Sequence, residues 1–170
     1  AVLMKVNSNM VAVIDFGSQY TQLIARRIRE LNVFSEIYPH TVTKNDLEEN
    51  NIKAIVLSGG PSSVYDEKSP MLDDSIFEMN CPILGICYGL QLLIQKYHGE
   101  VIPSGQGEYG FEKIKVENFE CILKGFSQNS QVWMSHGDKV ENISENWNIL
   151  AVSSNDVVAA VKKKEKNIYG

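Results

Sequence analysis

Residues 81–95 read Cys-Pro-Ile-Leu-Gly-Ile-Cys-Tyr-Gly-Leu-Gln-Leu-Leu-Ile-Gln. They predict a short apolar strand over 82–86 that turns sharply, through two glycines, into an amphipathic helix. Cys87 stands at this turn and at the positive end of the helix, a position that favours a thiolate. The pattern Gly85-x-Cys87-x-Gly89 has the shape of a nucleophile elbow, in which small residues let neighbouring backbones approach. We therefore predict a cysteine nucleophile, and the alternative is an inert buried thiol.

Strand and helix patterns alternate upstream of this turn. Strands are predicted over 10–16, 33–38 and 54–57, and helices over 23–31, 45–50 and 73–79. Such alternation indicates an α/β fold, with an open, mainly parallel twisted sheet that carries helices on both faces, as in flavodoxin-like proteins. Ligands of such sheets bind outside the carboxyl ends of the strands. The loops 17–19, 58–61 and 87–89 are expected to meet there.

After Gly99 the sequence changes to alternating β-rich segments. Strands are predicted over 111–116, 131–135, 149–153 and 157–161, and residues 167–170 resemble the start of another strand. We interpret these segments as edge strands and hairpins that continue the same domain. With no internal repeat or low-complexity linker, residues 1–170 are predicted to form a single domain.

The composition indicates a soluble domain with a sizeable core. The chain of 170 residues is 44% hydrophobic and has a formal net charge of -5. It contains no apolar run of the roughly 20 residues that cross a bilayer, so a cytoplasmic location without membrane partners is expected. The acidic balance gives no general attraction for nucleic acid, and the lysines at 162, 163, 164 and 166 are interpreted as a solvated turn. Three cysteines without a close pair favour neither a disulfide framework nor a metal site.

A thiol that attacks a carboxamide needs N–H donors aimed at the developing negative charge. The sequence offers the backbone N–H of Tyr88 and the glycine turn Ser58-Gly59-Gly60-Pro61. This turn lacks the spacing and the lysine of a P-loop, so phosphate binding is the weaker alternative.

Five ordered motifs then resemble a known family. They are Asp15-Phe16-Gly17-Ser18-Gln19-Tyr20, Ser58-Gly59-Gly60-Pro61, Gly85-Ile86-Cys87-Tyr88-Gly89-Leu90-Gln91, Gly107-Glu108-Tyr109-Gly110 and Ser135-His136-Gly137-Asp138. Together they resemble the class I glutamine amidotransferases and, within that class, the GMP synthetases. The resemblance runs from about Met10 to Gly170.

The resemblance implies glutamine hydrolysis through a γ-glutamyl thioester on Cys87. Gly60 and Tyr88 would supply the oxyanion N–H groups. The α-amino and α-carboxyl groups of L-glutamine would be held by Gln91, Ser135, His136, Gly137 and Asp138, with His136 in a loop. The domain itself would need no cofactor. The ammonia would pass to a partner, the ATP pyrophosphatase domain or subunit of GMP synthetase, which uses ATP and Mg to convert XMP to GMP.

One departure from the family pattern concerns proton transfer. The family completes its triad with a histidine and a glutamate in a Phe-His-Pro-Glu segment, before which this sequence stops, so the 170 residues alone are expected to be nearly inactive. Among the three histidines, only His136 is a candidate substitute for the base. Glu108 and Tyr109 are expected either to stabilise a loop near the site or to contact the synthetase.

Two other functions stay open at this stage. One is an amidotransferase subunit for anthranilate or carbamoyl phosphate synthesis. The other is a catalytically incomplete docking or regulatory module that retains the fold.

Overall fold

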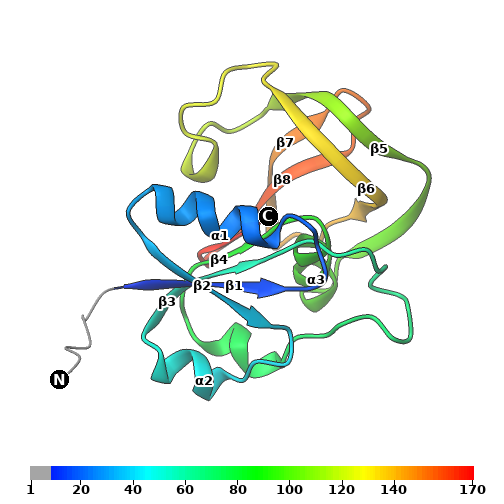
Figure 1. Cartoon of the computed structure of the whole chain (residues 1–170). Coiled ribbons are helices and arrows are strands. Elements are labelled where there is room, and N and C mark those ends of the chain that lie inside the picture. The colour runs from blue at the N-terminus through cyan, green and yellow to red at the C-terminus, as the bar shows by residue number, and fades with distance from the viewer. Residues whose placement is uncertain (1–8) are drawn as a thin grey trace, which may run out of the picture.

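The computed structural model describes residues 9–170, apart from the side chains of residues 104–106. Within these residues the strands form a nine-stranded sheet in the order β2-β1-β3-β4-β9-β8-β7-β5-β6 (Figure 1). Neighbours are parallel from β2 to β9 and antiparallel from β9 to β6. The chain therefore has a parallel half and an antiparallel half that meet at β9.

The parallel half alternates strands and helices along the chain. Its elements are β1 (Met10–Asp15), α1 (Thr21–Glu30), β2 (Phe34–Pro39), α2 (Lys44–Glu49), β3 (Ile52–Leu57), the 3-10 helix η1 (Asp74–Glu78), β4 (Ile83–Gly85), α3 (Tyr88–Lys96) and the late strand β9 (Ile168–Tyr169). Because successive strand side chains point to opposite faces, Val13 packs with Ala25 of α1, whereas Ile14 packs with Leu47 of α2 and Leu93 of α3. The predicted α/β fold with helices on both faces is confirmed.

The antiparallel half is built from long strands. Its elements are β5 (Glu100–Val116), the 3-10 helix η2 (Cys121–Leu123), β6 (Gln131–Asn142), β7 (Trp147–Ser153) and β8 (Val158–Lys163). In Figure 1, β5 and β6 form an extended hairpin that curves beside α3. This hairpin brings residues distant in the sequence towards the carboxyl ends of the parallel strands.

Several boundaries differ from the prediction. Residues 73–79 form only the short η1, and the strand predicted to end at residue 135 continues to Asn142, so His136 lies inside β6 instead of in a loop. β5 begins eleven residues before the predicted strand because register shifts at Glu100/Val101 and between Pro103 and Glu108 break the alternation that reveals a strand. β7 and β8 are internal strands, so their interpretation as edge strands was wrong.

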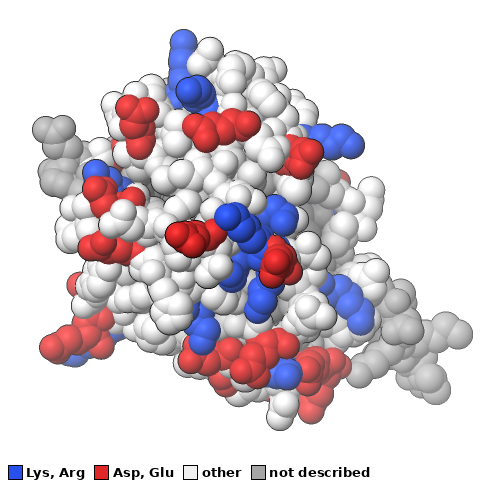
Figure 2. Space-filling model, turned by 180° about the vertical axis from the view of Figure 1, so that it is seen from behind, with Lys and Arg blue, Asp and Glu red and all other residues white. Residues whose placement is uncertain are grey.

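Charged side chains of both signs share the face in Figure 2, where basic groups gather near the centre and acidic groups surround them. The lysines at 162, 163, 164 and 166 were predicted to form a solvated turn, and this holds only for Lys164 and Lys166. Lys163 lies in β8, is 8% exposed and places its ammonium 4.6 Å from the centre of the Tyr97 ring. Its aliphatic stem and charge are therefore packed on aromatic surface.

None of the helices within residues 9–170 is long and apolar enough to cross a membrane.

Candidate active site

Cys87 occupies a strained turn between β4 and α3. Its φ of 52° and ψ of -110° are unusual for a residue with a side chain, and strain of this kind persists only where the surroundings enforce it. The surroundings demand glycine on both sides. A Cβ on Gly85 would lie 2.6 Å from the backbone nitrogen of Leu90, and one on Gly89 would lie 2.3 Å from the Leu57 carbonyl oxygen. The predicted elbow geometry is confirmed.

The ionisation of Cys87 differs from the prediction. The residue is exposed at the site, yet enough protein surrounds the thiol for burial to raise its pKa above the ordinary value. The prediction of a favoured thiolate at the helix start was therefore wrong, because desolvation disfavours the charged form. A protonated thiol needs a base before it can attack an amide.

The glycine turn after β3 lies against the nucleophile. A Cβ built on Gly59 would be 3.4 Å from the Cys87 Cβ, and one on Gly60 would be 2.4 Å from the Phe16 carbonyl oxygen. Among the described residues, the backbone N–H groups of Gly60 and Tyr88 have no hydrogen-bond acceptor. The N–H of Gly89, in contrast, donates to the Ser58 carbonyl oxygen at 3.1 Å. Two unpaired donors thus remain beside the thiol.

Ser58 connects the loops that surround Cys87. It is fully buried, and its hydroxyl accepts from the Phe16 N–H at 3.2 Å and lies 3.2 Å from the Thr21 hydroxyl. Thr21 also lies 3.1 Å from a carboxylate oxygen of Asp15, which accepts from the Gly17 N–H. These bonds hold the glycine turn against the loop after β1. The sequence identified Ser58 only as a member of the turn, since its partners are 37 and 42 residues away.

A cavity of about 410 Å³ opens beside Cys87. A volume of this order suits a small polar ligand. All eight predicted site residues line it, namely Cys87, Gly60, Tyr88, Gln91, Ser135, His136, Gly137 and Asp138. Gln91 lies one turn beyond Cys87 on α3, as predicted, and its N–H donates to the Cys87 carbonyl oxygen at 3.0 Å.

Further residues line this cavity that the sequence did not single out as substrate contacts. They are Pro61, Ser62, Ser63, Asp66 and Tyr109. Asp66 accepts from the Ser63 N–H at 2.9 Å, so its carboxylate is held by its own loop. Asp66 and Asp138 place two carboxylates at the cavity, which suits a ligand that carries an ammonium group.

His136 uses both ring nitrogens. Nδ1 lies 2.8 Å from the carbonyl oxygen of Asp138, and Nε2 lies 2.9 Å from a carboxylate oxygen of Glu108. The partner of each ring nitrogen is thus an oxygen of the protein, and the Cys87 thiol is not among the partners described for His136. The arrangement therefore disfavours His136 as the base for Cys87.

The other two histidines lie outside the cavity. Nδ1 of His40 lies 3.2 Å from the Met71 carbonyl oxygen. His98 follows the end of α3 and has a φ of 66°.

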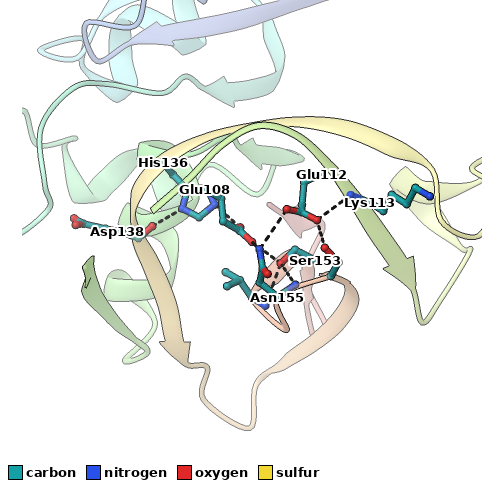
Figure 3. A network of polar contacts seen from close by, with 9 residues as sticks. Glu108, Glu112, Lys113, His136, Asp138, Ser153 and Asn155 are labelled. Carbon is teal, nitrogen blue, oxygen red and sulfur yellow. Dashed lines mark hydrogen bonds and ion pairs between the residues drawn. The ribbon is translucent and has the colours of Figure 1, made fainter. Parts of the chain in front are cut away.

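Glu108 lies behind the cavity wall in a polar network (Figure 3). Burial is the largest influence on its carboxyl and acts to raise the pKa. Hydrogen bonds from Ser153, Asn155 and His136, together with the charge of His136, outweigh burial and lower the pKa of Glu108. These contacts agree with the first of the two roles expected for Glu108, stabilising the segment at the site. Tyr109 is 71% exposed and lines the cavity.

The lowered pKa of Glu108 predicts a dependence of stability on pH. An unfolded glutamate has a pKa of about 4.3, so the carboxylate stabilises the fold fully above that pH, and the contribution is lost as pH falls through the lower folded value. As the pH falls from about 6 to about 3, the free energy of unfolding should decrease less for Glu108→Gln than for the unmodified protein. Urea titrations across this range measure the difference, and equal losses would contradict the expectation.

A second, more apolar hollow of about 800 Å³ also borders Cys87 and shares Gly60 and Ser135 with the first. Tyr20 and Leu23 from the start of α1 and Trp133 from β6 line it, together with Ile86. Trp133 packs edge-on against Phe111, with ring centres 5.1 Å apart. Cys87 therefore lines both hollows.

Comparisons with known proteins agree with this geometry. Residues 12–170 match the family Glutamine amidotransferase class-I. A GMP synthase (glutamine-hydrolysing) of Brachyspira hyodysenteriae is 49% identical over 98% of this chain, and one of Natranaerobius thermophilus is 48% identical over 95%. The chain spans only 32% of the length of either relative.

A solved structure of a Thermoplasma acidophilum protein, provisionally described as one of the subunits of a GMP synthase, has a TM-score of 0.84 and 29% identity. The match covers 95% of this chain and 81% of that one. With the family matched over residues 12–170 and the elbow, glycine turn and cavity in place, the chain belongs to the class I glutamine amidotransferase family.

Proposed function

We propose that this chain is the glutaminase portion of a GMP synthase and releases ammonia from L-glutamine at Cys87. The observation that carries the proposal is the single cavity that collects all eight predicted site residues, which come from both halves of the sheet. The names of the similar proteins support GMP synthesis over the anthranilate and carbamoyl phosphate alternatives.

The chemistry follows from the positions of the groups. The Cys87 sulfur attacks the side-chain carboxamide carbon, and the unpaired N–H groups of Gly60 and Tyr88 stabilise the oxyanion. The C–N bond then breaks, ammonia leaves with an added proton, and a γ-glutamyl thioester remains. Water attacks this thioester and releases glutamate and the thiol.

Substrate binding uses the remaining cavity residues. Asp66 and Asp138 pair with the α-ammonium group, and Gln91 and the segment 135–138 complete the contacts with the α-carboxyl end. Ligands of this kind are oriented by a few fixed polar groups.

The proton transfers need a base that the described residues do not place at Cys87. β9 runs parallel to β4, with Tyr169 opposite Leu84, and Gly170 packs on Leu90 of α3. A chain that continues beyond Gly170 thus arrives at the sheet edge that carries Cys87. We infer that the histidine and glutamate of the family triad reach the thiol by this route in the complete protein.

The ammonia is consumed by a synthetase domain or subunit that converts XMP to GMP in the cytoplasm. ATP and Mg act in that partner, and the glutaminase domain works without a cofactor. A close partner is expected because free ammonia is otherwise protonated and lost.

The proposal is tested with a glutamine analogue that carries a chloroketone in place of the carboxamide. In the complete protein we expect one adduct, on Cys87, with labelling suppressed by excess glutamine. Mass spectrometry of peptides locates the adduct. Cys121 is an exposed thiol and serves as the internal control, because it lacks the oxyanion donors. Adducts on Cys121 at an equal rate, or none on Cys87, would refute the proposal.

A further inference from the structure

Glu108 joins three segments that are distant in the sequence. It lies in β5 directly opposite His136 of β6 and is only 8% exposed. One carboxylate oxygen is 2.9 Å from Nε2 of His136, and the other accepts from the Ser153 hydroxyl at 2.7 Å and the Asn155 amide at 3.1 Å. Figure 3 shows this carboxylate between the imidazole and the turn that follows β7. Both oxygens of the carboxylate therefore have fixed hydrogen-bond partners, which set the orientation of the group.

The connection continues from His136 to the cavity. Nδ1 of the same ring lies 2.8 Å from the Asp138 carbonyl oxygen. The imidazole therefore connects Glu108 to the backbone of β6 two residues further on. Ser135, Gly137 and Asp138 line the cavity, whereas Glu108 is not among the lining residues. Among the contacts described for the Glu108 side chain, the one with His136 is the one that leads to the cavity lining.

Cys87 has a separate support. The elbow is held to the end of β3 by two backbone hydrogen bonds. The Ile86 N–H donates to the Leu57 carbonyl oxygen, and the Gly89 N–H donates to the Ser58 carbonyl oxygen. None of the bonds described for Glu108 reaches these residues. Loss of the Glu108 carboxylate thus loosens one wall of the cavity and leaves the nucleophile and the oxyanion donors in place.

We propose that Glu108 is a positioning residue, which fixes the 135–138 wall through His136 and so sets the affinity for glutamine rather than the rate of the chemical step. This inference rests on the proposed function. The buried pair forms a charge-assisted hydrogen bond, which is stronger than a neutral one and holds its partners in a narrower geometry.

The test uses glutaminase kinetics of the complete protein. We expect Glu108→Ala to raise KM for glutamine about tenfold or more, with kcat changed less than about threefold. Glu108→Gln should restore KM to within about threefold of the unmodified value. Its amide oxygen can accept from Ser153 and Asn155, and its NH₂ can donate to Nε2 of a neutral imidazole, which still donates to Asp138.

Glu112 is the matched control. It lies on the same strand and contacts Ser154 and Asn155, but it does not contact His136. Glu112→Ala is expected to change KM by less than about twofold. An equal rise in KM for both alanine variants would overturn the inference.

A double-mutant cycle shows whether Glu108 acts through His136. If it does, adding Glu108→Ala to His136→Ala leaves KM unchanged, whereas independent effects multiply. Thermal unfolding of each variant shows whether it is folded. Should Glu108→Ala fail to fold, the exposed Asn155→Ala takes its place, with an expected rise in KM of about two- to threefold.

The outcomes also separate this inference from the proposed function. An unmodified protein that neither hydrolyses glutamine nor labels at Cys87 refutes both. An active protein in which Glu108→Ala leaves KM unchanged, or lowers kcat and folded fraction together, refutes only the role of Glu108.

Discussion

Replacement of Cys87 by alanine is expected to lower glutamine-dependent GMP formation by the complete protein about a thousandfold or more. Without the thiol no thioester forms, and no other group beside Gly60 and Tyr88 can attack the carboxamide. Ammonium chloride should still support the reaction at a rate close to that of the unmodified protein, because it bypasses glutamine hydrolysis. Parallel assays of glutamate release and of GMP formation with each nitrogen source measure both effects.

Cys121→Ala is the control for this experiment. Its thiol is exposed and lies in η2, outside both hollows beside Cys87. Both activities should survive this change. Persistence of glutamine-dependent activity in Cys87→Ala would exclude Cys87 as the nucleophile, and loss of the ammonia-dependent activity would point to a structural defect instead.

The second large effect is expected for Gly89→Ala. Alanine in a helix ordinarily stabilises the helix by about 1 kcal/mol relative to glycine, so helix propensity alone favours the Gly89→Ala variant. At position 89 the new Cβ would lie 2.3 Å from the Leu57 carbonyl oxygen and 2.6 Å from the Leu57 Cβ. Since backbone atoms of β3 cannot move without disturbing the sheet, we expect a loss of about 3 kcal/mol of unfolding free energy.

Gly59→Ala provides the comparison for urea unfolding. Its Cβ would meet no atom closer than 3.4 Å, and its backbone φ is not positive. We expect a change of less than about 1 kcal/mol. If Gly89→Ala proves as stable as Gly59→Ala, the close packing of α3 on β3 is not what fixes the elbow.

The local signals around Cys87 predicted the fold well. The strand, turn and helix of residues 82–96 follow from the pattern of neighbouring residues in the sequence. β1 and α1 are likewise predicted by their local sequence pattern. β5 was partly hidden, because Pro103 and several glycines interrupt its alternation. Local periodicity thus locates elements whose pairing is regular and misses those with shifted register.

The site was predicted unevenly for a related reason. Cys87 and Tyr88 follow from the elbow and Gly60 from the glycine turn, but Ser135 to Asp138 came from resemblance to a family. The support that Glu108 receives from Ser153 and Asn155 spans 45 and 47 residues, which no sequence pattern reveals. The direction of the Cys87 pKa was missed because desolvation depends on the packed walls of the site.

The place of β9 bears on how the chain acquires its structure. β9 lies between β4 and β8, and the backbone of Gly170 exchanges hydrogen bonds with Val161 in both directions. A ribosome delivers β9 after both of its neighbours, so each of them presents an open edge until residue 169 has emerged. The sheet consequently becomes continuous across its two halves only once residue 169 has emerged, and a nascent chain that stalls earlier exposes two edges competent for aggregation.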